Sequence, residues 1–368
     1  MDNISLELID KILNGKKIRY EYLDELFKKY KKFFPKMSVI NIFIDLPYIL
    51  NQLYNPENIK NLSILMNKSD KYSITSNLLN LAGHYRHYFA SRMECYTNIV
   101  FMYNSKIDKK IKEIDKDYNK TYYEKRYSYD NAVFGDLNLL IKDNIKIMKL
   151  ILEHVPNCSF ADSEYMDYRC IFPYMVEKEE FKDNINIILT DNKLMYQNLI
   201  TSNTLILTPK LDKSLVITLG GGLRHLLGKS KTIEKHPEYL AMNIENIPIM
   251  ESMVNHKKND TLGIKNFGYL KALAYLYKNN IDVDRTYVTT KIIDELFADK
   301  FNDVELNIIK NNFKIYNNYL LSSEYKKDLD LKYPKFIKYI ENNDDLRKVN
   351  ETLFRKNPIL IDFLFDGE

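Results

Sequence analysis

Short apolar runs that alternate with segments of helical periodicity constrain the fold of this 368-residue chain more than any other feature. The first run, residues 37–50 (MSVINIFIDLPYIL), is rich in β-branched side chains and closes on Asp45-Leu46-Pro47, which is typical of a strand buried on both faces. A strand, a helix and a second strand form the unit of a parallel sheet, so the pattern predicts an α/β fold with a mostly parallel sheet. Further strands are expected at 97–105, 158–162, 185–190, 204–209 and 214–219.

Helical segments flank the expected sheet at both ends of the chain. Residues 4–34 carry apolar positions at helical spacing that predict two helices, and the chain is again mostly helical from about residue 230. A single core stops growing at roughly 250–300 residues, so this length favours more than one unit. We expect an N-terminal helical extension (1–37), an α/β domain (38–228), a helical domain (229–322), and C-terminal helices with a tail (323–368).

The charge balance and the cysteines exclude several classes of protein. Lys and Arg exceed Asp and Glu by only 54 to 50, so a polyanionic partner would have to meet local basic clusters. Cys95, Cys158 and Cys170 form no CxxC pair, which argues against a zinc knuckle or a disulfide framework. No apolar run reaches the roughly 18–20 residues that span a bilayer, and the start MDNISLELID does not resemble a signal peptide. The sequence therefore predicts a soluble, cytoplasmic protein without a membrane partner.

The glycine-rich segment 218–231 (TLGGGLRHLLGKSK) superficially matches a phosphate-binding P-loop. That loop needs four residues between its first glycine and Gly-Lys-Ser, whereas five residues separate Gly222 from Gly228 here. We expect a flexible turn after the last strand instead, because glycines allow a sharp reversal of direction.

Polar side chains gather where the expected strands end. The strands of a doubly wound sheet present their carboxyl ends to one crevice, so these side chains are expected to converge there. Mg2+ prefers oxygen ligands, and two such ions can activate water and stabilise the leaving oxygen in phosphodiester hydrolysis. The alternative for Asp191 is to cap the helix that follows it. The residues concerned are Asp45, Asn104, Asp162, Glu164, Asp167, Asp191 and Asn192.

A second polar feature lies in the helical part, at residues 259–279 (NDTLGIKNFGYLKALAYLYKN). Gly263 and Gly268 bracket a tight turn between two short helices, and exposed N–H groups at such a turn can cradle a phosphate. This would be a sequence-independent grip on a duplex backbone, and the alternative is a helical hairpin with a solvated basic face. The surrounding lysines are Lys257, Lys258, Lys265 and Lys271.

In their order along roughly residues 40–280, these segments resemble the 5′-nuclease superfamily of flap endonucleases, polymerase-associated 5′-3′ exonucleases and bacteriophage ribonuclease H. NIFIDLPYIL is similar to the first-strand motif, DSEYMDY to the Glu-Ala-x-Asp motif, and ILTDNKLMYQNL to the Ser-x-Asp-Lys-Asp motif. NIVFMYNS looks like the second motif, and NDTLGIKNFGYLKALAYL resembles the helix-three-turn-helix that grips duplex DNA. The resemblance implies a PIN-like α/β domain and a helical duplex-binding domain. DYNKTYYEKR looks like the basic end of the family's arch, which implies DNA contacts from Lys125 and Arg126.

Several acids of the family are replaced in this chain. The second-strand Asp falls on Asn104, and the acid two residues after Glu164 falls on Met166. The opening acid of the Gly-Asp-x-x-Asp motif falls on Lys257. An ungapped match through Lys193 and Gln197 places the Asp-x-Asp pair on Asn192 and Leu194 and leaves Asp191 one position early.

The remaining acids are too few for a full pair of metal sites. Two divalent ions need enough anionic ligands to offset their charge, so the second site is expected to be lost and the first weakened. By resemblance, the candidate catalytic residues are Asp45, Glu164, Asp167, Asp191 and Asp260, and all but Asp260 are candidate ligands of Mg2+ or Mn2+.

The C-terminal segment ILIDFLFDGE is short, apolar and acidic. It looks like the peptides by which phage replication and late-transcription proteins bind a sliding clamp, and the alternative is a tail folded onto its own domain. The candidate anchors are Ile361, Phe363, Leu364 and Phe365.

Together these features predict a structure-specific DNA-binding protein of phage replication or repair with reduced or lost metal-dependent phosphodiesterase activity. Branched, nicked or duplex DNA, or an RNA–DNA hybrid, would be its partner. One alternative is an active 5′-3′ exonuclease, flap endonuclease or ribonuclease H that uses Mg2+ or Mn2+. A further alternative is a scaffold or virion protein without nucleic-acid chemistry.

Overall fold

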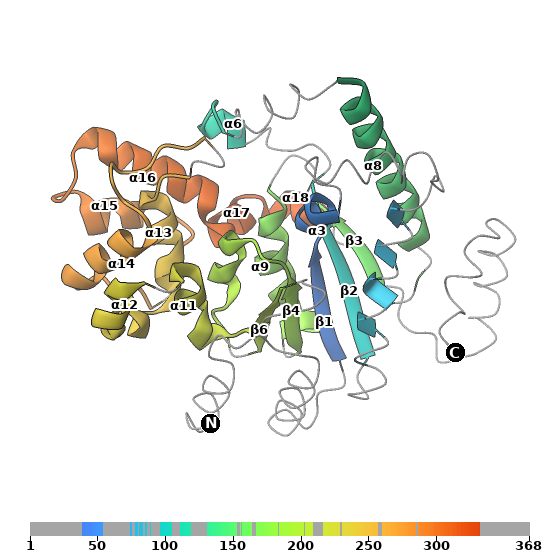
Figure 1. The fold of residues 1–368 in the computed structure, drawn as a ribbon, viewed down its shortest axis with the longest axis horizontal. Helices are drawn as coiled ribbons and strands as arrows, with labels where there is room; N and C mark the ends of the chain where they lie inside the picture. Colours follow the sequence, from blue (N-terminus) through green and yellow to red (C-terminus); the bar gives the residue numbers. More distant parts are fainter. Residues whose placement is uncertain are drawn as a thin grey trace, which may run out of the picture.

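The computed structural model describes most of the chain between residues 39 and 331 (Figure 1). Predictions for the N-terminal extension and for the tail therefore lie outside the described residues. No helix in the described part is long and apolar enough to cross a membrane. The described ranges are 39–53, 96–104, 111–118, 131–152, 157–163, 167–182, 184–201, 203–208, 216–228, 230–256, 260–284 and 286–331, with Val155 and parts of 74–89.

A six-stranded sheet with the order β3-β2-β1-β4-β5-β6 forms the centre of the α/β part. All neighbouring pairs are parallel except β5 and β6. The chain adds β2 and β3 on one side of β1, and β4 to β6 on the other, so the direction of winding switches between β1 and β4. Ligand sites of open α/β sheets lie at such a switch point. The strands are β1 (Val39–Asp45), β2 (Tyr96–Tyr103), β3 (Cys158–Asp162), β4 (Ile185–Leu189), β5 (Thr204–Leu207) and β6 (Val216–Ile217).

Three asparagines fix the register of the central strands. Asn41 of β1 lies opposite Asn98 of β2 and Asn186 of β4. The Asn98 side-chain amide donates to Asn41 Oδ1 at 2.9 Å, and the Asn41 amide donates to Asn186 Oδ1 at 2.9 Å. A slip of one residue would remove these bonds from the buried amides of Asn41 and Asn186, so the ladder disfavours other registers.

Alternate residues of β1 pack against different layers of helices. Ile42 and Ile44 face a core that includes Ile145 and Met148 of α8 (Asn131–Leu152). Phe43 faces the opposite core, which continues without a break into the helical part. In Figure 1 the helical part, yellow to orange, lies on one side of the sheet and α8, green, on the other.

The helical part is built from short helices that share this second core. The longest, α16, begins with a capping box in which Asn302 and Glu305 satisfy each other's backbone N–H groups. These helices are α11 (Gly222–Leu227), α12 (Lys231–Lys235), α13 (Ile247–Met253), α14 (Tyr269–Lys278), α15 (Lys291–Phe297), α16 (Asp303–Tyr316), α17 (Asn318–Glu324) and α18 (Lys326–Leu331).

The structure corrects the expected end of the first strand. The strand expected over 37–50 ends at Asp45, and α3 (Leu46–Leu53) begins at once. Pro47 lies in the first turn of α3, where its missing N–H costs nothing. The expected helix at 191–200 is likewise the 3-10 helix η3 (Lys193–Asn198).

The glycine-rich segment is not a flexible turn. Gly222 opens α11, and a Cβ added there would lie 2.4 Å from Ile244 Cδ1 and 3.2 Å from Leu199 Cδ1. Close packing of α11 against these side chains, rather than freedom of the backbone, therefore explains the glycine at this position.

Candidate functional site

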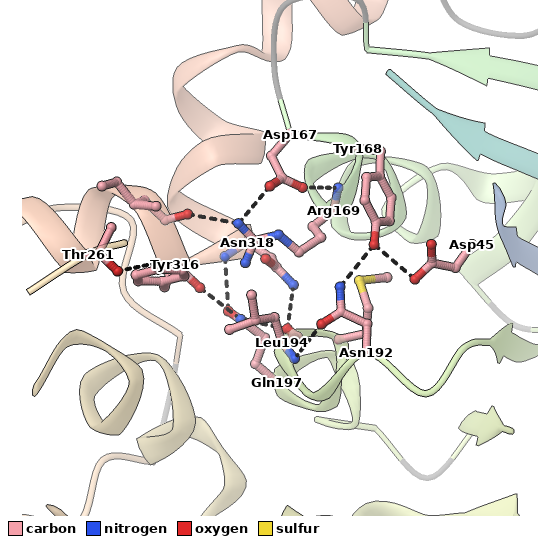
Figure 2. Close-up of polar contacts among 12 residues, drawn as sticks. Asp45, Asp167, Tyr168, Arg169, Asn192, Leu194, Gln197, Thr261, Tyr316 and Asn318 are labelled. Carbon is pink, nitrogen blue, oxygen red and sulfur yellow. Dashed lines mark hydrogen bonds and ion pairs between the residues drawn. The ribbon is translucent and has the colours of Figure 1, made fainter. Parts of the chain in front are cut away.

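Asp45 lies at the switch point of the sheet, where β1 ends beside β4, and its side chain is completely buried. Asp45 Oδ1 accepts the backbone N–H of Tyr48 at 2.9 Å, as a cap of α3 would. Asp45 Oδ2 accepts the hydroxyl of Tyr168 at 2.9 Å and that of Thr190 at 2.6 Å (Figure 2 shows Tyr168). Protein groups therefore bond both oxygens of the carboxylate.

Burial raises the pKa of Asp45 to about 6. The hydrogen bonds from Thr190, Tyr48 and Tyr168 lower the pKa and so limit this rise. The charge of nearby Asp167 raises the pKa slightly. At neutral pH, Asp45 is therefore mostly an anion that three internal donors stabilise.

Asn192 completes a closed set of bonds around Asp45. The Asn192 amide donates to Tyr168 Oη at 2.9 Å, and the Asn192 N–H donates to Thr190 Oγ1 at 2.9 Å. Asn192 Oδ1 accepts the N–H of Leu194 at 3.1 Å and so caps η3. The expectation that Asp191 would cap this helix is therefore wrong. Asn192, on which a family acid falls, has taken that position.

Asp167 is neutralised by a buried arginine two residues later. The Arg169 guanidinium lies 2.7 Å from Asp167 Oδ2, and the Arg169 N–H donates to Asp167 Oδ1. Both side chains are more than nine-tenths buried. Asp167 therefore brings no uncompensated charge to the end of the sheet.

Leu194 and Gln197 face the helical part rather than solvent. Leu194 packs against a small core that contains Ile111, Tyr118 and Tyr316. Gln197 is buried, and its amide donates to the carbonyls of Leu194 and Tyr316, each at 2.8 Å. The Ser-x-Asp-Lys-Asp-like segment thus forms contacts between the two parts of the molecule.

The other expected strand-end residues are placed as follows. Asn104 is buried at the end of β2, and Asp162 forms an ion pair with Lys149 of α8. Asp191 is half-buried. Burial raises the pKa of Tyr48 to about 12, and the charge of Asp191 adds to that rise. Glu164 lies outside the described residues. Among those described, no three His, Cys, Asp or Glu side chains are placed to share a metal ion.

The second candidate region joins α13 to α14 and includes Asp260; we call it turn 254–268, and the structure describes its residues 254–256 and 260–268. A Cβ on Gly263 would lie 2.3–2.4 Å from backbone atoms of Val254 and Asn255, so only glycine fits. Gly268 precedes α14 in an extended conformation and gives no side-chain cap to its first N–H groups. Lys265 and Lys271 are exposed, whereas Lys257, Lys258, Lys125 and Arg126 lie outside the described residues.

Sequence reasoning missed a buried pair behind this turn. Glu251 of α13 is fully buried, and its Oε2 accepts the hydroxyl of Tyr269 at 2.9 Å and lies 3.2 Å from His256 Nε2. Burial raises the pKa of Glu251 to about 8 and lowers that of His256 to about 4, so both are mostly neutral near pH 7. Glu251 and His256 lie five positions apart, but their charge state depends on burial, which the spacing alone did not indicate. For Arg169, the nearby acid in Asp167-Tyr168-Arg169 was an available signal.

Neither a protein-family model nor a curated protein matches this sequence. Solved structures of bacteriophage T5 proteins do match the fold of this chain. A T5 protein co-crystallised with metal ions aligns with a TM-score of 0.51 at 12% identity, over 80% of this chain and 99% of that one. A T5 flap endonuclease, solved as a pseudo-enzyme–product complex with DNA and metal ions, aligns with a TM-score of 0.51 at 12% identity, over 86% and 98%. The T5 5′-exonuclease with bound zinc aligns with a TM-score of 0.50 at 11% identity, over 86% of this chain and 98% of that one.

These alignments cover nearly the whole of each T5 chain and 80–86% of this one. At identities of 11–12% they establish the architecture alone. The chain therefore shares the α/β fold of these T5 structures, with a six-stranded, mostly parallel sheet flanked by helices.

Proposed function

We propose that this chain binds branched, nicked or duplex DNA through its sugar–phosphate backbone, and that its metal-dependent phosphodiesterase activity is reduced or lost. Within the proposal, turn 254–268 is the helix-three-turn-helix that contacts the backbone. The strand-end cluster, which we define as Asp45, Asp167, Tyr168, Arg169 and Asn192, is the remnant of the metal site.

The observation that carries the loss of activity is the internal bonding of Asp45. A carboxylate offers about four lone-pair positions, and protein donors take two on Oδ2 and one on Oδ1, which leaves about one for an ion. Arg169 places a positive charge beside Asp167, where a metal pair requires negative charge. The described residues therefore do not fit a pair of divalent ions.

DNA binding is supported by the exposed charge of the other region. Lys265 and Lys271 are exposed on and after the turn, and the side chain of Lys271 lies over Phe267, 4.9 Å from the ring centroid. N–H groups that start a helix without a side-chain cap attract phosphate. A T5 protein of the same fold was solved with DNA.

A 5′-flap and a nicked duplex test both parts of the proposal. With EDTA present we expect binding that weakens as salt rises, because phosphate contacts release counterions. With Mg2+ or Mn2+ we expect no cleavage above that of the Asp45→Ala variant. Failure of the wild type to bind any duplex would favour the alternative of a scaffold protein.

The active nuclease remains the rival, because Asp45 occupies the switch point at which this fold places its chemistry. Metal-dependent cleavage that Asp45→Ala abolishes would establish the rival and end the proposal of lost activity. Clamp binding through Ile361, Phe363, Leu364 and Phe365 stays a prediction from the sequence.

A further inference from the structure

The C-terminal end of α16 is capped by side chains from the α/β part. The last carbonyls of a helix have no partner within it. Here Ile315 O accepts from Arg169 Nη2 at 3.1 Å, and Tyr316 O accepts from the Gln197 amide at 2.8 Å. Gln197 Oε1 also accepts the N–H of Asn318 at 2.9 Å. A guanidinium at a helix C-terminus is also favoured by the helix dipole.

The same helix end holds turn 254–268 on its other side. The Asn312 amide donates to Ser252 O at 3.1 Å and to Leu262 O at 2.7 Å, and so joins the end of α13 to the turn. The hydroxyl of Tyr316 bonds to the buried side chain of Thr261. Thr261 in turn forms a backbone bridge with His256 across the turn.

Tyr316 takes part in both sets of contacts. Its ring is fully buried and stacks on His256, with centroids 3.9 Å apart and an interplanar angle of 28°. The Arg169 guanidinium lies 5.7 Å from the centre of the same ring. Figure 2 shows Tyr316 between Thr261 and the group that contains Gln197 and Arg169.

We infer that Tyr316 is a positioning residue for DNA binding: Gln197 and Arg169 hold it, and it holds turn 254–268 in the conformation that accepts backbone phosphates. The inference rests on the proposed function. The segments that carry acids in the family would then act, in this chain, as the support of the duplex-binding turn. The contacts are directional and buried, so the loss of one changes the position of the turn rather than its charge.

Two variants each remove one side chain's hydrogen bonds from the contacts that link Gln197, Tyr316 and Thr261. Tyr316→Phe deletes the hydroxyl that meets Thr261 and keeps the ring stack and the backbone carbonyl. Gln197→Met keeps the length of the side chain and removes its donor and acceptor. We expect affinity for a nicked duplex, measured by anisotropy in EDTA at fixed salt, to fall about 5-fold and about 3-fold respectively.

The matched control is Tyr239→Phe in the same helical part. The ring of Tyr239 packs on Tyr277 and His236 rather than on the turn. The affinity of Tyr239→Phe for the nicked duplex should stay within about 2-fold of wild type.

A double-mutant cycle that combines Tyr316→Phe with Lys265→Ala distinguishes positioning of the turn from a general loss of stability. If Tyr316 acts through the turn, its substitution should cost less affinity once a phosphate-binding lysine of the turn is gone. Hydrogen exchange in the free protein gives a second readout. The amides of His256 and Ile264, which bond to Thr261 O and Met253 O, should exchange faster in Tyr316→Phe, with the amides of β1 unchanged.

The outcomes distinguish the inference from the proposed function. A wild type that binds no duplex overturns both. A wild type that binds, with Tyr316→Phe equal to it in affinity and in exchange of the turn, overturns the inference alone.

Discussion

The charged side chains of the strand-end cluster are buried and compensated, whereas those of turn 254–268 and the helix after it are exposed. At the cluster, Asp45 and Asp167 are buried: hydrogen bonds stabilise the carboxylate of Asp45, and an ion pair with Arg169 compensates that of Asp167. On and after the turn, Lys265 and Lys271 are exposed, and the helix start is left without a side-chain cap. A site that must bind an ion or a phosphate leaves its charge uncompensated until the ligand arrives. By that criterion the turn is prepared for a ligand and the cluster is not.

Arg169→Met should have the largest effect, because it leaves the Asp167 carboxylate buried without its partner. We expect the free energy of unfolding to fall by about 3–5 kcal/mol in urea titrations. Lys310→Ala is the control: its ion pair with Asp294 is partly exposed, and its loss should cost less than about 1 kcal/mol. Equal effects of the two substitutions would contradict the view that the cluster is a buried, compensated set.

Gly263→Ala should affect the turn strongly, because its Cβ would overlap the backbone of Val254. We expect a loss of about 2–4 kcal/mol in stability and at least a 10-fold loss in duplex affinity. Gly221→Ala is the matched control, since its Cβ would have 3.9 Å to its nearest neighbours. If Gly263→Ala kept full duplex affinity, the close approach of residue 263 to the backbone of Val254 would not be needed for binding.

The pH dependence of stability tests the buried acid behind the turn. The folded-state pKa of Glu251, about 8, is above that of the unfolded chain, so its proton binds the folded state more tightly. Stability from this group is present at low pH and is lost as pH rises through 8. Between pH 6.5 and 8, wild type should lose about 1–2 kcal/mol more than Glu251→Gln, and the contribution of His256 cancels in this difference because both proteins contain it. Parallel curves of thermal unfolding against pH would show that Glu251 stays charged.

Lys271→Ala should give the smallest change. Removing one phosphate contact should weaken duplex binding a few-fold and lower the slope of log affinity against log salt by about 1. Lys310→Ala, on α16, serves again as the charge-matched control. Because every sequence offers the same phosphates, the loss should be equal for unrelated duplexes, and a loss confined to one sequence would point to base contacts instead.

The sequence predicted the parts of the fold that depend on local signals. Apolar runs of β-branched residues identified the strands, and the order of motifs led to the expected α/β fold, which the T5 structures share. The start of α3 was missed because Ile49 and Leu50 continue the apolar run beyond Asp45, so periodicity did not mark the change from strand to helix.

The candidate site was less predictable because its contacts join distant segments. Asp191 and Asn192 are equally good caps by residue type, and the hydroxyl of Thr190, which binds the N–H of Asn192, marks the one that is used. The bond from Gln197 to Tyr316 spans 119 positions. The catalytic roles expected for Asp45, Glu164, Asp167, Asp191 and Asp260 stay predictions, and the cleavage assay with Asp45→Ala tests the first of them.

The double use of Asp45 bears on how such chains are classified. The same carboxylate that resembles a metal ligand also caps α3 and joins β1 to the segment after β4. Selection for folding alone is enough to retain this acid, whether or not the chain hydrolyses DNA. An aspartate at the end of the first strand is therefore poor evidence of hydrolysis by a chain of this fold, and neighbours such as Asn192 and Arg169 are the better diagnostic.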